Sequence, residues 1–268
     1  MGEWMSVRVL LNIGNKFEDI SEKAGLSQET GWWNCVVAAD FDHDGDMDLV
    51  AGNLGLNNKY KASKKFPFEV YSKDFDNNGT LDIVMAYYNN DTLYPLRGLE
   101  SSYNQLPFIR QKFPTYRAFG KATLSDVYGT VNLQNALNYK AKNFASSYFE
   151  NMGDGTFKTR PLCNMAQISS VNSILVEDFN NDGNLDLVIA GNLYGSEAET
   201  PRSDASIGLF LRGDGKGNFE PVPTMQSGLF ISGEVREINL IHLAKIGARG
   251  IIVAKNNEPM QILRTAIN

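Results

Sequence analysis

Acidic loops built on one repeated template constrain the fold of this chain more than any other feature. The 268-residue sequence contains 17 Asp, and 11 of them fall in three nine-residue windows. These windows read DFDHDGDMD at 40–48, DFDNNGTLD at 74–82 and DFNNDGNLD at 178–186. Each has glycine at its sixth position, where a short loop turns through positive φ to point successive oxygens inward. The shared template predicts three copies of one loop structure.

The oxygen-bearing side chains of these windows predict calcium sites. Positions 1, 3, 5 and 9 supply side-chain oxygens and position 7 a backbone carbonyl, which suits a hard cation with six or seven oxygen ligands. The predicted ligands of the first site are Asp40, Asp42, Asp44, Asp46 and Asp48. Those of the second are Asp74, Asp76, Asn78, Thr80 and Asp82, and those of the third are Asp178, Asn180, Asp182, Asn184 and Asp186. Ordinary turns also use Asp, Asn and Gly, but the threefold recurrence favours the metal.

Charge repulsion indicates that the calcium is structural. Ten carboxylates stand at positions 1, 3, 5 and 9 of the three windows, and without a cation each cluster would concentrate like charge. Three Ca²⁺ would balance the formal net charge of −6. The first window offers four of these carboxylates and the others three each, so we expect it to bind calcium most tightly.

The residues around the windows predict strands rather than helices. A helical calcium hand requires Glu at position 12, whereas the chain has Ala51, Met85 and Ile189 there. Apolar, β-branched runs precede the loops, as in CVVAAD, and follow them, as in DLVIAGN. Each loop is therefore predicted to connect two strands.

A second repeated unit predicts an array. LLNIGNKF (10–17), FENMGDGTF (149–157) and LRGDGKGNF (211–219) each read as a strand, a glycine-rich turn and an aromatic residue, which indicates a hairpin. Further along, HLAKIGARGIIVAKN aligns with DFNNDGNLDLVIAGN and places His242, Ala244, Ile246 and Gly250 at the ligand positions, while Gly247 retains the turn. We interpret this segment as a fourth repeat without its metal ligands.

Together these motifs resemble the FG-GAP or VCBS repeat family, whose DxDxDGxxD loops join strands in the blades of β-propellers such as the integrin α head. The chain is also similar to the C-terminal region of large bacterial, Bacteroidetes-type VCBS-repeat surface proteins. The stretches that carry this resemblance are AGNLGLNNKYKAS, LPFIRQKFPTYRAFGKATL, PRSDASIGLFLRGDGKGNF and VAKNNEPMQIL. The resemblance implies an extracellular, cell-surface or periplasmic protein that displays a binding surface for protein or polysaccharide, without catalysis.

We therefore predict an all-β fold, a β-propeller-like array of about four to five blades that forms one domain over residues 1–268. The repeat pattern is open at both ends, which favours a longer parent chain. Apolar residues at three- and four-residue steps, interrupted at Pro107 and Pro114, predict two or three short helices inserted at 96–130. These helices either pack on the propeller or shape a ligand site.

Composition excludes several functions and leaves others open. With 25 basic and 31 acidic side chains the chain has no electrostatic affinity for nucleic acid, and no apolar run is long enough for membrane insertion. Cys35 and Cys163 are either one disulfide or two buried thiols.

The alternative function is a propeller-based carbohydrate-active enzyme, a polysaccharide lyase or hydrolase, and six charged residues outside the loops are candidates for it. These are Glu100, Asp126, Glu197, Glu199, Arg202 and Asp204. They form no recognisable catalytic constellation. The loop at 194–206 is either a ligand contact or a plain solvent-facing loop, and Trp32, Trp33, Tyr87 and Tyr88 are either sugar-stacking residues or core.

Overall fold

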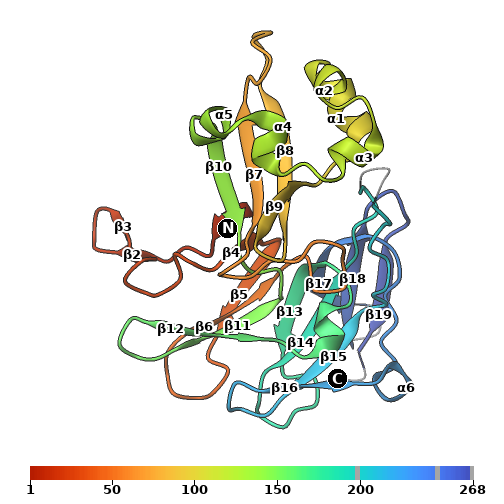
Figure 1. Ribbon diagram of the computed structural model, residues 1–268. Helices are drawn as coiled ribbons and strands as arrows, with labels where there is room; N and C mark the ends of the chain where they lie inside the picture. The colour runs from red at the N-terminus through yellow and green to blue at the C-terminus, as the bar shows by residue number, and fades with distance from the viewer. Residues whose placement is uncertain (197–199, 245–247, 266–268) are drawn as a thin grey trace. The chain divides into compact units, whose positions relative to one another are not determined.

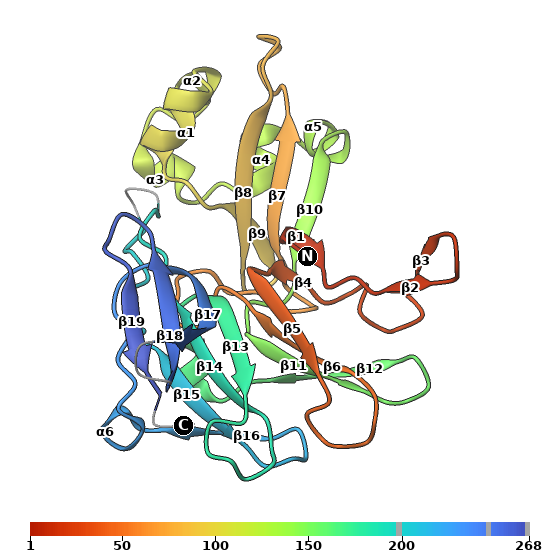
Figure 2. The same cartoon turned by 180° about the vertical axis from the view of Figure 1, so that it is seen from behind.

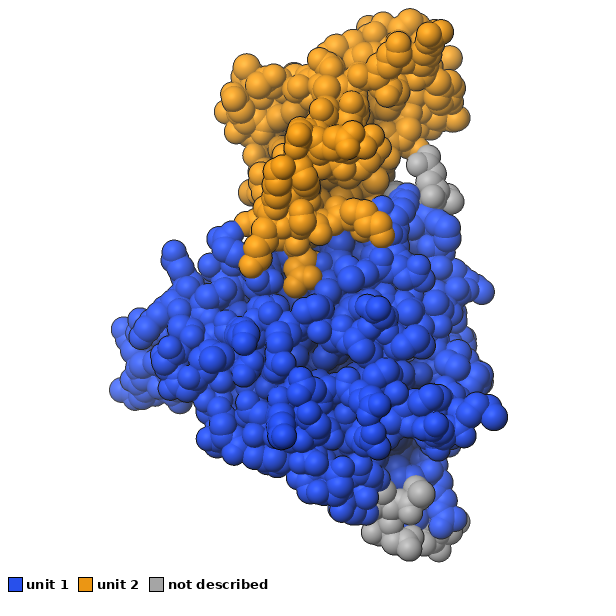
Figure 3. Space-filling view, turned by 60° about the horizontal axis from the view of Figure 1, so that its bottom comes forward, with its two compact units in different colours: residues 1–59, 144–268 blue, residues 60–143 orange. Residues whose placement is uncertain are grey.

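The computed structural model describes residues 1–196, 200–244 and 248–265. The chain divides into two compact units, which Figure 3 shows in separate colours. Unit 1 comprises residues 1–59 and 144–268, and unit 2 comprises residues 60–143. Each unit is described separately below.

Unit 1 contains two four-stranded antiparallel sheets (Figure 1). We number the sheets of three or more strands along the chain, so that the sheet of unit 2 is the second. The first sheet has the order β12-β11-β6-β5 and the third has the order β13-β14-β15-β16. Their strands are β5 (Cys35–Ala39), β6 (Asp48–Gly52), β11 (Ser147–Asn151), β12 (Phe157–Pro161), β13 (Val171–Glu177), β14 (Asp186–Gly191), β15 (Leu209–Gly213) and β16 (Phe219–Val222). In the first sheet β6 pairs with β11, although the whole of unit 2 separates them in sequence. Unit 2 is thus inserted between the second and third strands of one blade.

Further elements of unit 1 are shorter or incomplete blades. A three-stranded fourth sheet consists of β17 (Val235–Leu243), β18 (Ala248–Lys255) and β19 (Gln261–Arg264). Near the N-terminus, β1 (Glu3–Ser6) pairs with β4 (Thr30–Trp32), and β2 (Leu10–Asn12) pairs with β3 (Phe17–Asp19). A 3₁₀ helix (Asn164–Gln167) and α6 (Thr224–Ser227) connect strands. All three predicted hairpins are present, as β2–β3, β11–β12 and β15–β16.

Unit 2 is a four-stranded antiparallel sheet with helices, in the order β10-β7-β8-β9. Its strands are β7 (Phe68–Lys73), β8 (Asp82–Asn89), β9 (Thr92–Pro95) and β10 (Leu137–Ala141). Between β9 and β10 lie α1 (Leu99–Gln105), α2 (Phe108–Lys112), α3 (Tyr116–Phe119), α4 (Leu124–Tyr128) and α5 (Thr130–Gln134). Within residues 60–143, all of which are described, there are thus five short helices rather than the expected two or three. Pro107 stands at a helix boundary as predicted, and Gly120 and Gly129 stand at further boundaries that account for the extra interruptions.

All four strand pairs that flank a loop of the template share one register. The residue just before the loop pairs with its ninth position, as in Ala39 with Asp48, Lys73 with Asp82 and Glu177 with Asp186. In the fourth pair Ile241 opposes Gly250, and the ladder continues through His242–Arg249 and Leu243–Ala248 into the former loop. Ile246 and Gly247 of the predicted alignment lie outside the described residues. The shared register supports the interpretation of this segment as a degenerate repeat.

Within unit 1, hydrophobic cores lie between neighbouring sheets, as packed blades require. One core of unit 1 joins the first and third sheets around Val50, Tyr148 and Leu211, and another joins the third and fourth sheets around Val188 and Ile251. Unit 2 has its own core between its sheet and helices. The predicted all-β, propeller-like fold with a helical insertion is confirmed, whereas a single domain over residues 1–268 stays a prediction.

Candidate metal centre

The three acidic loops share one backbone conformation. The sixth-position glycines Gly45, Gly79 and Gly183 have φ of 95°, 87° and 90°, as the template predicts. The fourth position is also left-handed, with φ of 63° at His43, 60° at Asn77 and 56° at Asn181. Sequence reasoning missed this second turn, although Asn and His are among the non-glycine residues that tolerate this region best.

Hydrogen bonds inside each loop turn the predicted ligand oxygens toward its interior. The sixth-position N–H donates to the first-position carboxylate at 3.1 Å in Asp40, 2.8 Å in Asp74 and 2.9 Å in Asp178. The fifth-position N–H donates to the third-position side chain, at 3.4, 3.2 and 2.9 Å in the three loops. The seventh-position N–H donates to the fifth-position side chain, at 3.0, 2.8 and 2.8 Å. Three side chains of each loop therefore curl around one centre.

The first loop carries negative charge that its backbone donors compensate only in part. Oxygens of Asp40, Asp42 and Asp44 lie within 4.8 Å of one another. Oδ1 of Asp40 and Oδ1 of Asp46 are buried and have no hydrogen-bond partner among the described residues. Burial, followed by the neighbouring aspartates, raises the pKa of Asp42 and of Asp46. This loop has the oxygen set and the uncompensated charge that a hard cation would satisfy.

The second loop also brings three acids together. Asp74, Asp76 and Asp82 place carboxylate oxygens within 4.8 Å of one another. The N–H of Gly79 is the main cause of a lowered pKa at Asp74. This loop has a convergent oxygen set, with less charge than the first.

The third loop differs, because among the described residues Asp178, Asp182 and Asp186 do not place carboxylate oxygens all within 4.8 Å of one another. The side-chain amide of Asn180 instead donates to Asp182 Oδ2 at 2.8 Å. The asparagine at the third position therefore supplies a donor that offsets part of the charge.

The ninth-position aspartates are buried and have a second role in the structure. Their carboxylates accept a hydrogen bond from the N–H of the second-position phenylalanine, at 3.2 Å in Asp48, 3.0 Å in Asp82 and 3.0 Å in Asp186. Asp48 also accepts from the N–H of Asn151 at 2.8 Å, and Asp186 from the N–H of Gly213 at 3.0 Å. Both donors are the last residue of the third strand in their sheet. The ninth aspartate thus closes the base of each loop, and in the first and third loops it also ties the loop to the next strand. In the second loop Asp82 instead accepts from the side-chain amide of Gln105 in α1 at 3.3 Å.

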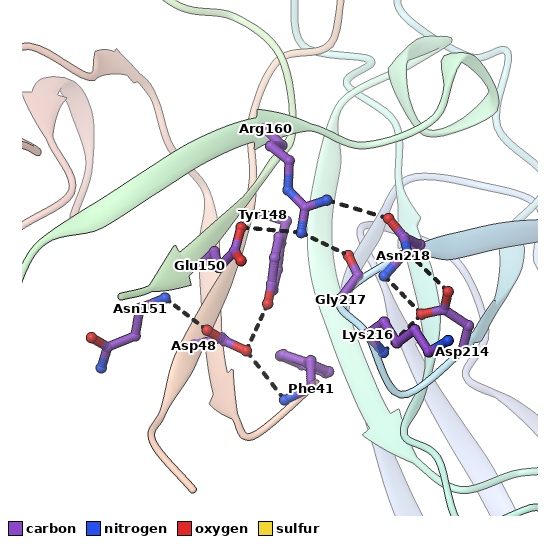
Figure 4. Close-up of polar contacts among 10 residues, drawn as sticks. All are labelled: Phe41, Asp48, Tyr148, Glu150, Asn151, Arg160, Asp214, Lys216, Gly217 and Asn218. Carbon is purple, nitrogen blue, oxygen red and sulfur yellow. Dashed lines mark hydrogen bonds and ion pairs between the residues drawn. The ribbon is translucent and has the colours of Figure 1, made fainter. Parts of the chain in front are cut away.

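A buried tyrosine links the first loop to the third sheet (Figure 4). The hydroxyl of Tyr148, a residue only 2% exposed, donates to Asp48 Oδ2 at 2.7 Å. The guanidinium of Arg160 lies 4.9 Å from the centroid of the Tyr148 ring and donates to Asn218 Oδ1 at 3.2 Å. Nε2 of His43 lies 3.2 Å from Oδ1 of Asn184, so the first and third loops touch directly. The sequence placed these loops in separate repeats, and only the fold brings them together.

The described charged residues that were considered for catalysis have structural partners within their own unit. In unit 2, Glu100 accepts a long hydrogen bond from Tyr116 and Asp126 forms the capping box of α4. In unit 1, Arg202 pairs with Asp204 at 2.9 Å. Glu197 and Glu199 lie outside the described residues.

The aromatic residues considered for sugar stacking divide between core and surface. Trp33 is 2% exposed and packs on Phe149, and Trp32 packs on Trp4 and Phe144. In unit 2, Tyr88 lies against Phe66, whereas Tyr87 is exposed. Both cysteines are free thiols, and burial raises the pKa of Cys35 to about 12.

Comparison with known proteins identifies the repeat. Residues 2–51, which include the β2–β3 hairpin, β5 and the first acidic loop, match the model of the FG-GAP-like repeat. No curated protein matches the chain. Among the described residues, no helix combines the length and apolar character needed to cross a bilayer. The predicted resemblance to FG-GAP repeats is confirmed for residues 2–51, which form an FG-GAP-like repeat.

Proposed function

We propose that this chain is a calcium-binding, non-catalytic FG-GAP-repeat domain that presents a binding surface for protein or glycan outside the cell, at the cell surface or in the periplasm. The observation that carries the calcium assignment is the first loop. It combines three convergent carboxylates with two buried carboxylate oxygens, on Asp40 and Asp46, that lack a hydrogen-bond partner among the described residues. Buried charge of this kind is costly unless a counter-ion is present.

The donor set favours calcium over other metals. Every predicted ligand atom is a carboxylate, amide, hydroxyl or carbonyl oxygen, which suits a hard cation. The side chains of Asp40, Asp42 and Asp44 and the carbonyl of Asp46 would hold the Ca²⁺. Its positive charge would offset the negative charge of the three carboxylates. Asp48 would then act mainly through its hydrogen bonds to Phe41, Tyr148 and Asn151, which hold the loop base closed.

The structural partners of the charged residues outside the loops support the non-catalytic assignment. The described candidates for an acid or base have structural partners, as Asp126 has in its capping box and Asp204 in its ion pair. A general acid and base must both reach one substrate. No specific observation favours the alternative of a polysaccharide lyase or hydrolase.

Calorimetric titration of metal-stripped protein with calcium tests the proposal. The variant Asp42→Asn/Asp44→Asn removes two charges from the first loop and leaves Asp48 in place. We expect it to weaken the tightest site at least about tenfold. The control Asp91→Asn/Asp204→Asn removes two charges from exposed sites, where the side chains are 84% and 47% accessible, and should leave every site unchanged. No heat of calcium binding, or equal losses in both variants, would contradict the proposal.

A further inference from the structure

A pocket of about 220 Å³ opens between the third and fourth sheets of unit 1. The apolar residues that line it are Phe179, Val188, Phe210, Leu229, Ile251 and Leu263. The rings of Phe179 and Phe210 meet edge to face at 5.8 Å and are only partly buried. Because an apolar cavity of about 150 Å³ is enough to bind benzene, this pocket has room for one aromatic ring.

The equivalent space between the first and third sheets is filled by a phenylalanine. Phe41 corresponds to Phe179, since each stands at the second position of its acidic loop. Tyr148 corresponds to Phe210, since each pairs with the valine two residues after the ninth aspartate. Phe219 packs against the first pair members, with ring centroids 5.3 Å from Phe41 and 5.7 Å from Tyr148. Phe41 and Tyr148 are consequently only 3% and 2% exposed.

In the third sheet this filling ring is carried by the outermost strand. Phe219 is the first residue of β16 and pairs with Gly213, the last residue of β15. The next residue, Glu220, pairs with Arg212, and their side chains form an ion pair. The outermost strand therefore presents an aromatic residue followed by an acid to its neighbour.

The fourth sheet has the same neighbour strand and, among the described residues, no strand beyond it. Its order is β17-β18-β19, and Figures 1 and 2 show β19 at its outer edge. Leu263 corresponds to Leu211, since each pairs with the residue that follows the ninth loop position. Arg264 therefore corresponds to Arg212, and Thr265 takes the place of the last residue of β15. Arg264 is exposed and has no ion-pair partner among the described residues.

We propose that the edge of β19 and the adjoining pocket bind an extended strand of a protein partner, whose aromatic residue enters the pocket and whose next residue is an acid that pairs with Arg264. The strand adds to the sheet antiparallel to β19, so that its backbone groups pair with the exposed edge. Its aromatic residue lies opposite Thr265 and points to the third sheet, because Thr265 shares a face with the core residue Leu263. This inference deepens the proposed function, since it names the class of partner that the binding surface takes.

The strand edge favours a polypeptide from another protein over a glycan or a second copy. Its N–H and C=O groups repeat at the spacing of a peptide backbone, which a sugar does not match. The aromatic–acid pairs in the described strands of this chain, such as Phe17–Glu18 and Phe219–Glu220, lie in strands that already have a partner. A second copy therefore offers no unpaired strand of this pattern among its described residues.

NMR titration of the full chain with a synthetic peptide tests this proposal. The peptide KGNFEPV has the sequence of residues 216–222 and so carries the aromatic–acid pattern. We expect saturable shifts of the amide resonances of Ile262 and Arg264 in β19. The same peptide with Phe219→Ala should bind at least about tenfold more weakly, because it has no ring to bury in the pocket.

An exchange of charge between protein and peptide tests the predicted register. Arg264→Glu in the protein should weaken binding of the peptide at least about threefold, and Glu220→Lys in the peptide should restore it. Arg264 is exposed, so folding should be unaffected, which circular dichroism melts check. The control Lys16→Glu makes the same change of charge at an exposed residue of the β2–β3 turn and should leave binding unchanged.

Four outcomes would overturn the proposal. They are the absence of shifts in β19, equal binding of the peptide without its ring, failure of the charge exchange to restore binding, and a dimer of the chain that the peptide dissociates. The last outcome, measured by sedimentation equilibrium, would assign the edge to a second copy. The calorimetric titration with calcium is a separate measurement on the same protein, so failure of this inference is distinguishable from failure of the calcium assignment.

Discussion

Removal of the Tyr148 hydroxyl tests whether Asp48 acts as a structural anchor of the first loop. The substitution Tyr148→Phe keeps the ring and its contacts with Phe41, Phe219 and Arg160. It deletes one hydrogen bond of 2.7 Å between a residue 2% exposed and a buried carboxylate. Burial and the hydrogen bond to Asp48 also raise the pKa of Tyr148, so the phenol is the donor at any ordinary pH.

A hydrogen bond to a charged group contributes about 1.5 to 3 kcal/mol to the free energy of unfolding. Asp48 keeps the N–H donors of Phe41 and Asn151 in the variant, so we expect a loss of about 2 kcal/mol. Since the proposed function gives Asp48 a hydrogen-bonding role in the base of the loop, we expect the same loss in calcium and in chelator.

Urea unfolding, followed by tryptophan fluorescence, measures this loss as a lower midpoint at unchanged slope. The matched control is Tyr116→Phe, whose hydroxyl lies 3.4 Å from Glu100 Oε2 on a residue 66% exposed. That control should lower the free energy of unfolding by less than about 0.5 kcal/mol. A loss at Tyr148 no larger than the control, or one that vanishes in chelator, would refute the anchor role of Asp48.

Three further outcomes are expected. Gly79→Ala should lower the free energy of unfolding by about 1 to 2 kcal/mol through backbone strain alone, because φ is 87° and no neighbour lies within 4 Å of the new Cβ. The control Gly195→Ala, at an open position outside the left-handed region, should leave the free energy of unfolding unchanged in the same urea assay. The thiol of Cys35, whose pKa is raised to about 12 by burial, should resist alkylation near neutral pH until the protein unfolds, and labelling of Cys35 in the native state, detected by peptide mass mapping, would contradict this. The amide resonances of Gly45, Gly79 and Gly183 in an NMR spectrum report on one loop each. In a calcium titration the Gly45 resonance should shift first, because its loop has the most carboxylates. If the first loop fills last, calcium affinity does not follow the number of carboxylates.

Local patterns in the sequence were sufficient to predict the repeated units. Apolar, β-branched runs around the acidic windows predicted strand–loop–strand units, and the structure has them at β5–β6, β7–β8 and β13–β14. The degenerate repeat was also recognisable, because Gly250 falls in the register of the three ninth-position aspartates. These features depend on residues close in sequence, whose periodicity is visible in one chain.

The parts that sequence reasoning missed depend on contacts between distant residues. Asp48 is anchored by Tyr148 and Asn151, about a hundred positions away, and nothing in the window DFDHDGDMD indicates those partners. The interruption of the first blade by unit 2 was likewise hidden, since β6 and β11 are each ordinary strands by pattern.

Calcium-dependent stability tests the central claim most directly. The free energy of unfolding of the full chain is measured in chelator and in calcium at a hundredfold excess over the dissociation constant. Since the folded loops gather ligands that the unfolded chain keeps apart, we expect calcium to add about 2.7 kcal/mol for each occupied site. Equal stability in chelator and in calcium, with no metal bound by the folded protein, would contradict the account and leave the three windows as turns.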